Sequence, residues 1–114
     1  MKRPREITII QEECIRAFCV PRALFYSKRA QFDAAYARFA SMVLCERLLG
    51  ITTGENGRAH NRDRSVIGWA RKSVAEWETV APMLAHRVKT IEAIAVNRIS
   101  ELPKTNPQKR KDQR

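Results

Sequence analysis

The chain has 114 residues, of which 22 are Lys or Arg and 12 are Asp or Glu, so its formal net charge is +10. This length suits one domain with one modest core and leaves no room for a separate catalytic module. The excess of cations favours a polyanionic partner, with nucleic acid ahead of an anionic membrane surface. Three cysteines without paired spacing fit a reduced chain better than a disulfide scaffold.

The N-terminal stretch MKRPREITII is basic and then apolar, but the polar residues QEE end the apolar run. We therefore expect neither a signal peptide nor a transmembrane span. Apolar side chains then recur at helical spacing over residues 7–19, which predicts a first helix. Pro21 suits the first turn of a short second helix over residues 21–26, because its fixed φ is helical and no N–H is missed there.

The clearest apolar repeat predicts a core helix over residues 32–49. Its expected buried stripe is Phe32, Tyr36, Phe39, Ala40, Val43, Leu44 and Leu48. Gly50 follows the last periodic residue, at the place where a left-handed C-cap is needed. Thr52 and Glu55 then stand in capping-box spacing and predict the start of a short helix over residues 53–60.

Two further helices are predicted over residues 64–80 and 82–102, the second of them begun by Pro82. We expect the helix over 64–80 to bury Val66, Trp69, Ala70, Val74, Trp77 and Val80. Its other face carries Arg64, Gly68, Arg71 and Lys72. No segment shows the alternating β-branched pattern of a strand, so the fold class is all-α, a small domain of about six helices.

The C-terminal segment has five cations, one anion and no apolar residue after Pro103. This composition predicts a disordered basic tail. The expected organisation is therefore one helical domain over residues 1–102 followed by a tail over 103–114.

The helices predicted at 53–60 and 64–80 are separated by a turn of about three residues, the signature of a helix-turn-helix. In that motif the second helix lies in the DNA major groove and its first residues meet base edges. Cations crowd the start of this second helix, where the helix dipole disfavours them unless an anion binds there. The cations concerned are Arg58, Arg62 and Arg64, and Asp63 stands among them. The alternative is a solvated loop beside an ordinary helix pair.

The segment ARFASMVLCERLLGITTGENGRAHNRDRSVIGWARK resembles the C-terminal DNA-binding domain of the bacterial replication initiator DnaA. The shared features are a long core helix, the Thr52–Glu55 cap, a Gly-x-Ala-aromatic turn at residues 57–60, and Arg62-Asp63 before the second helix. Upstream, IIQEECIRAFCVPRALFYSKRA is similar to the family's first two helices and basic loop. The resemblance covers about residues 7–80.

The resemblance implies that Arg29 of the basic loop enters the minor groove, while Asp63, Arg64 and Ser65 contact bases in the major groove. Thr52 and Thr53 would lie at the phosphate-facing start of the short helix. The full predicted set of DNA-binding residues is Lys28, Arg29, Thr52, Thr53, Arg58, Arg62, Asp63, Arg64, Ser65, Arg71 and Lys72. Double-stranded DNA is therefore the expected partner.

The chain also departs from the family at several positions. Arg64 and Trp69 stand where the family has histidines, Val66 replaces a threonine, Asn56 a core isoleucine and Glu46 a lysine, and the turn is Asn61-Arg62. We expect DNA binding to survive these changes, but the family's own box sequence need not be the preferred site.

No catalytic site is expected. GITTGENGR lacks the Gly-Lys-Ser/Thr ending of a P-loop, so no nucleotide-driven motor is expected, and an accessory or competitor role in replication initiation follows. His86 is predicted on the surface and Cys45 in the core, and no zinc, other cofactor or small-molecule substrate is expected.

Three alternatives remain open at this stage. A transcriptional regulator could use the same scaffold, and a basic protein of this size could instead bind RNA or act as an adaptor. The last helix could hold a protein partner or a second copy rather than its own domain. In the main interpretation the protein is cytoplasmic and associated with the nucleoid.

Overall fold

The computed structural model describes residues 3–29 and 31–103, which form six α-helices and no strand and so confirm the predicted all-α fold. The helices are α1 (Pro4–Ala17), α2 (Arg22–Tyr26), α3 (Phe32–Leu49), α4 (Thr53–Ala59), α5 (Ser65–Val80) and α6 (Pro82–Ser100). The tail predicted to be disordered falls, from residue 104 onward, outside the described residues. Among the helices described, none is long and apolar enough to cross a membrane.

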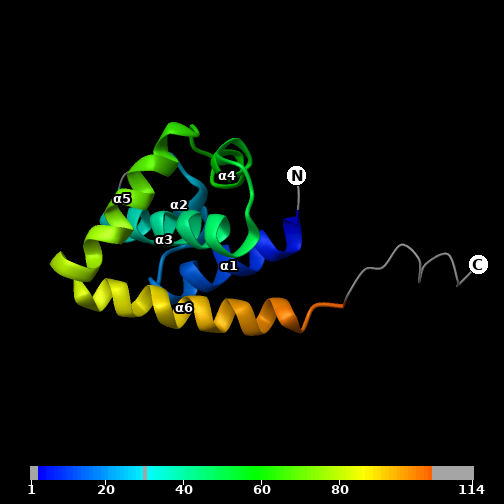
Figure 1. Ribbon diagram of the computed structural model, residues 1–114. Helices are drawn as coiled ribbons and strands as arrows, with labels where there is room; N and C mark the ends of the chain where they lie inside the picture. Colours follow the sequence, from blue (N-terminus) through cyan, green and yellow to red (C-terminus); the bar gives the residue numbers. More distant parts are fainter. Residues whose placement is uncertain (1–2, 30, 104–114) are drawn as a thin grey trace, which may run out of the picture.

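Helix α3 lies at the centre, and each of the other helices packs against it (Figure 1). Helix α6 runs along one side, with α1 between it and α3, whereas α4 lies on the opposite side. Helix α5 crosses the molecule from α4 to the start of α6. Small residues at Ala34, Ala37, Ala40 and Ser41 are fully buried, so neighbouring helices can approach the α3 backbone closely.

The helix ends follow the local signals of the sequence. Gly50 has φ 63° and caps α3 in the left-handed region, as predicted. The Thr52 hydroxyl accepts from the Glu55 amide at 3.1 Å, and the Glu55 carboxylate accepts from the Thr52 amide at 3.1 Å, which confirms the capping box. Helix α1 begins at Pro4 rather than at residue 7, because proline also fits the first helical turn there.

Three side chains predicted to lie in the core are on the surface. Phe32 is 80% exposed, Trp69 64% and Val80 72%. Phe32 is the first residue of α3 and stacks on Tyr36, with ring centroids 6.4 Å apart. The face that α5 buries is Ile67, Ala70, Val74 and Trp77. This face is rotated from the predicted one, which included Trp69 and Val80 in place of Ile67.

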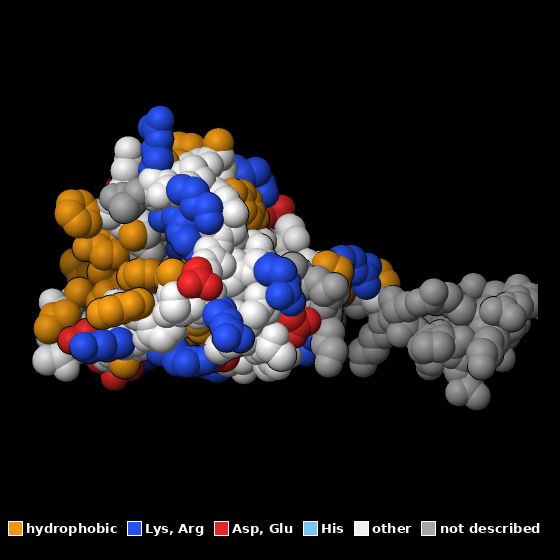
Figure 2. All heavy atoms as spheres, turned by 90° about the horizontal axis from the view of Figure 1, so that it is seen from above, with side chains coloured by type: hydrophobic (Ala, Val, Ile, Leu, Met, Phe, Trp, Pro, Cys, Tyr) orange, Lys and Arg blue, Asp and Glu red, His pale blue; other side chains and the backbone are white. Residues whose placement is uncertain are grey.

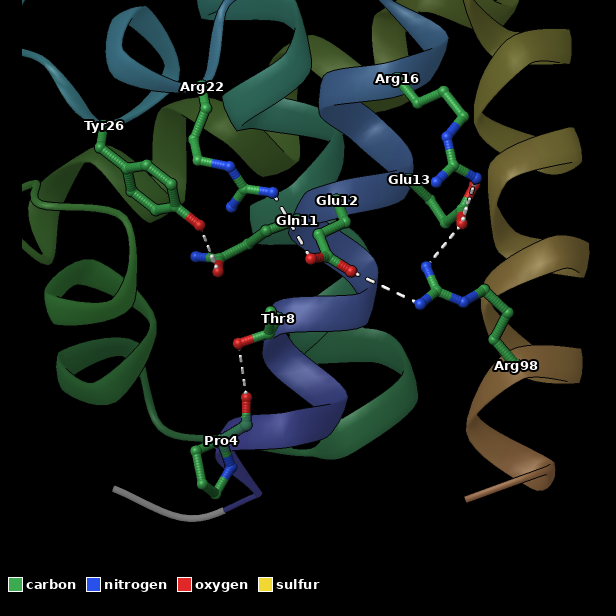
Figure 3. Close-up of polar contacts among 9 residues, drawn as sticks. All are labelled: Pro4, Thr8, Gln11, Glu12, Glu13, Arg16, Arg22, Tyr26 and Arg98. Carbon is green, nitrogen blue, oxygen red and sulfur yellow. Dashed lines mark hydrogen bonds and ion pairs between the residues drawn. The ribbon is translucent and has the colours of Figure 1, made fainter.

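Helix α6 belongs to the same domain, because it shares the core and is tied to α1 by buried charge. Val88, Ile91 and Ala95 contribute to the core. Figure 3 shows Arg98 of α6 directed at Glu13 of α1, whose carboxylate it contacts at 2.7 Å. Glu13 is only 3% exposed and also pairs with Arg16 at 3.1 Å. A buried carboxylate needs such partners, so this contact fixes α6 on α1.

Candidate nucleic-acid interface

The turn between α4 and α5 lies directly against the α4 backbone at Gly57. A Cβ on this residue would lie 2.7 Å from the Arg62 carbonyl oxygen and 3.1 Å from the Arg64 nitrogen. The Gly57 carbonyl accepts hydrogen bonds from the amides of His60 at 3.1 Å and Arg62 at 2.8 Å. Because both neighbours are backbone, neither can move aside without changing the turn, and the position requires glycine.

We therefore expect Gly57→Ala to lower the free energy of unfolding by about 1–2 kcal/mol, in the range of an overpacked contact. Gly68→Ala is the matched control, since a Cβ there meets nothing within 4 Å. Gly68 lies in the interior of α5, so alanine should raise stability by about 0.5–1 kcal/mol. Urea unfolding of both variants measures the difference. Equal stability of the two would show that the turn does not depend on this close approach.

His60 anchors the turn in the core. The sequence pattern did not predict this role. Its Nδ1 lies 2.9 Å from the Asn56 carbonyl oxygen, and its Nε2 lies 2.7 Å from the Ser41 hydroxyl of α3. A carbonyl only accepts, so Nδ1 carries the proton, and in the neutral ring Nε2 accepts from Ser41. Burial lowers the pKa of His60 to about 4, which keeps this ring neutral at neutral pH.

Asn56 is also fully buried. Its Nδ2 donates to the Met42 carbonyl at 2.9 Å, so the amide ties α4 to α3. Its Oδ1 has no hydrogen-bond partner within the described ranges. Burial of Asn56 and His60 could not be inferred from their polarity. The one available signal was that His60 occupies the aromatic place of the Gly-x-Ala-aromatic turn.

Asn61 joins this turn to the loop between α2 and α3, more than thirty residues earlier. It has φ 56°, in the left-handed region that asparagine tolerates. Its Nδ2 donates to the Tyr26 carbonyl at 2.9 Å, and its own carbonyl accepts from Lys28 Nζ at 2.9 Å. The structure therefore places Lys28 against the turn.

The buried side chain of Arg38 in α3 also holds the loop between α2 and α3. Its guanidinium donates to the carbonyls of Leu24, Phe25 and Arg29, each at 2.7–2.8 Å. The side chain is 3% exposed, so these bonds form in the interior and replace its hydration. They fix the backbone of Arg29, whose own side chain is exposed. Nothing in the sequence pattern distinguished Arg38 from the surface arginines.

The residues predicted to contact bases lie together at the start of α5. Asp63, Arg64 and Ser65 are all exposed. The Ser65 hydroxyl donates to the Asp63 carboxylate at 3.0 Å, so Asp63 orients Ser65 rather than Arg64. Arg64 is the N-cap of α5 rather than its first helical residue, and its side chain has no ion pair or hydrogen bond within residues 3–29 and 31–103. Its guanidinium is therefore free to bind a ligand.

Arg71 is exposed on α5, as predicted, but its side chain is engaged by an acidic residue. Its guanidinium pairs with Glu46 of α3 through both nitrogens, with Nε 2.7 Å from one carboxylate oxygen. This pairing holds the pKa of the Glu46 carboxyl below its usual range. Glu46 thus engages one cation of the predicted DNA-binding set. Lys72 and Gly68, in contrast, face outward and are exposed.

The remaining predicted residues belong to α4 and the turn. Thr52 uses its hydroxyl within the capping box, where it also donates to Glu55 at 3.0 Å, so this side chain has a structural function. Thr53 is half-buried in the first turn. Arg58 is exposed, whereas Arg62 is half-buried and donates to the Asn61 carbonyl at 3.0 Å. Of these four residues, Thr52 and Arg58 are exposed, and Thr53 and Arg62 are half-buried.

Figure 2 views the molecule from the side of α4 and the start of α5. Lys and Arg side chains are spread over this face, and acidic side chains are few on it. Hydrophobic side chains gather instead toward the end where α5 meets α6 and where α3 begins. The exposed apolar residues include Phe32, Val80 and Met83. The two kinds of surface are thus segregated along α5.

No metal or nucleophile site accompanies this surface. Within the described ranges, no three His, Cys, Asp or Glu side chains are grouped so that they could hold a metal ion. Cys14 and Cys45 are buried, and burial raises the pKa of Cys45 to about 12, so it is a thiol rather than a reactive thiolate. His86 is exposed, as predicted.

Comparison with known proteins assigns no family to this chain. No protein-family model matches the sequence, and no curated protein matches it.

Proposed function

We propose that this protein binds double-stranded DNA through α4, the following turn and α5, which form a helix-turn-helix. In this arrangement α5 lies in the major groove, and its first residues meet base edges. The observation that carries the proposal is the exposed Arg64 at the start of α5, whose side chain has no partner among the described residues and whose turn is fixed to the core by Gly57 and His60. Discrimination between DNA sequences requires a base-contacting side chain that is held on a rigid backbone in this way.

The loop beside the turn supports the same proposal. Lys28 contacts Asn61 of the turn, and Arg38 fixes the backbone of the neighbouring Arg29, so two exposed cations lie on the loop that contacts the turn. Such cations neutralise phosphates and position a protein on the duplex. The resemblance to the DnaA C-terminal domain further supports a minor-groove role for Arg29 and a role in replication initiation or its regulation. Transcriptional regulation on the same scaffold would be distinguished by footprints at promoters away from any origin.

Selection of bound duplexes from a random pool tests the proposal directly. One enriched sequence is expected, and its affinity should fall with salt. If about six phosphates are neutralised, log affinity against log salt should have a slope of about −5. Affinity that does not depend on salt, or a pool that shows no enrichment, would exclude this function.

The Glu46–Arg71 pair gives a sharper expectation for the electrostatic part of binding. Glu46→Gln should release Arg71 onto the DNA-facing side of α5, strengthen binding to every duplex, and steepen the salt slope by about one unit. Arg71→Ala alone should change little, because Glu46 already engages this side chain.

Glu92→Gln is the matched control for this measurement. Glu92 of α6 pairs with Arg47 at 2.8 Å, so its substitution also removes one negative charge and releases one arginine, but an arginine of α3 rather than of α5. Binding titrations at several salt concentrations compare the two variants. If they strengthen binding equally, the gain comes from net charge alone, and Arg71 does not reach the duplex.

A further inference from the structure

Trp69 is a large apolar side chain on the exposed surface of α5, where the sequence pattern had placed it in the core. It is 64% exposed, whereas Trp77, two turns along the same helix, is 5% exposed and buried against the Tyr36 ring. A tryptophan is usually mostly buried, so such exposure on the helix proposed to contact DNA calls for a ligand.

The position of Trp69 continues the proposed base-contacting surface. It lies four residues after Ser65, and residues four apart occupy the same face of a helix, one turn further along. Between them, Gly68 presents no side chain, and a Cβ there would meet nothing within 4 Å. The backbone of α5 can therefore approach a groove closely at this point, which brings the indole ring within reach of base edges.

The charge beside the ring favours a polyanion as its occupant. The Lys72 ammonium lies 5.9 Å from the centroid of the Trp69 ring, so the apolar surface is bordered by a cation. Exposed Glu76 follows two turns later on α5, before the apolar residues Val80, at the end of α5, and Met83, at the start of α6. A protein partner docked on that far apolar surface would have to cover Glu76 to reach Trp69.

In the major groove, the apolar group that a base presents is the C5-methyl of thymine. We propose that Trp69 packs on a thymine methyl and so sets a second specificity position next to the one set by Arg64. This inference rests on the proposed function and names the base that α5 selects. Lys72 would meet the adjacent phosphate while its alkyl stem covers the edge of the ring.

Deoxyuridine substitution tests this contact, because it removes the methyl group and leaves base pairing intact. Each thymine of the duplex selected by the wild-type protein is replaced in turn. One replacement should weaken wild-type binding about fourfold, which is the value of one buried methyl group. The same replacement should have no effect on Trp69→Ala. Val80→Ser is the control, since Val80 is equally exposed on α5 but should leave the whole substitution profile unchanged.

Fluorescence quenching of the unmodified protein gives an independent measurement. Acrylamide, which is uncharged, should quench Trp69 but not the buried Trp77, and the selected duplex should protect Trp69. If the selected duplex binds but no deoxyuridine has an effect and quenching is unchanged, the inference is overturned and Trp69 belongs to a protein-docking surface. If no duplex is selected at all, the proposed function fails and the inference fails with it.

Discussion

Arg64→Ala is expected to weaken binding to the selected duplex by about 1–3 kcal/mol and to remove the preference at one base pair. The physical reason is the planar guanidinium, which can donate two parallel hydrogen bonds to O6 and N7 of guanine. Arg64 is exposed at the start of α5 and has no partner elsewhere in the described part of the chain, so it loses no internal contact on binding. We accordingly expect guanine at the position that Arg64 contacts.

Arg64→Lys is the matched control because it keeps the positive charge but removes the planar guanidinium that can donate two parallel hydrogen bonds. It should retain most of the affinity for unrelated duplexes while losing the guanine preference. Titrations of the selected duplex and of a duplex altered at that base pair, at one salt concentration, measure both effects. If Arg64→Ala weakens the two duplexes equally, Arg64 contacts a phosphate, and the orientation proposed for α5 in the groove is wrong.

Acid is expected to unfold this protein through His60. Burial is the main cause that lowers the pKa of His60 from 6.5 to about 4, with smaller contributions of the same sign from Arg62 and Arg38, while the Asn56 carbonyl opposes them. Between about pH 6.5 and about pH 4, His60 is protonated in the unfolded chain but neutral in the folded chain. Stability should therefore fall as the pH drops from about 6.5 to about 4, by about 3 kcal/mol in total.

Urea unfolding across this pH range measures the effect, with His60→Gln as the variant that cannot titrate. The variant should be less stable than the wild type at about pH 7, because it loses the Ser41 contact, but its stability should depend less on pH. His86→Gln is the control, since His86 is exposed and should leave the pH dependence unchanged. Parallel pH profiles of the wild type and His60→Gln would assign the acid sensitivity to other groups.

Loss of the His60 contact also bears on the proposed function. The ring joins the α4–α5 turn to α3, so its protonation should loosen the segment that presents Arg64 before the rest of the domain unfolds. Preference for the selected duplex is thus expected to decline with pH earlier than helicity does. Binding and circular dichroism followed on the same samples would show this order.

Much of the fold could be predicted because its signals are local. Gly50, the Thr52–Glu55 capping box and Pro82 each act through the backbone of their own helix end, and the predicted ends at these places are confirmed. The grouping of Asp63, Arg64 and Ser65 at the start of α5 also follows from the chain order. The order, number and approximate length of the helices therefore required no knowledge of tertiary contacts.

The candidate site needed the tertiary structure wherever its geometry depends on residues distant in sequence. Lys28 reaches Asn61, Arg71 is engaged by Glu46, and His60 is buried against Ser41, although each residue type is common on protein surfaces. Such pairings arise from how helices pack, and no local pattern encodes them. These tertiary pairings decide which of the predicted DNA-contacting cations are available and which already interact with another residue of the chain.

In helix α5, the local sequence determined some features and tertiary packing determined others. The sequence determined that this segment is an amphipathic helix that starts beside Arg64, because spacing and propensity act within the helix itself. It could not determine whether Trp69 or Ile67 faces the core, since either stripe satisfies the same period. Packing against α3 decided this, burying Ile67 completely and leaving Trp69 exposed, because only one rotation of α5 fits its neighbours.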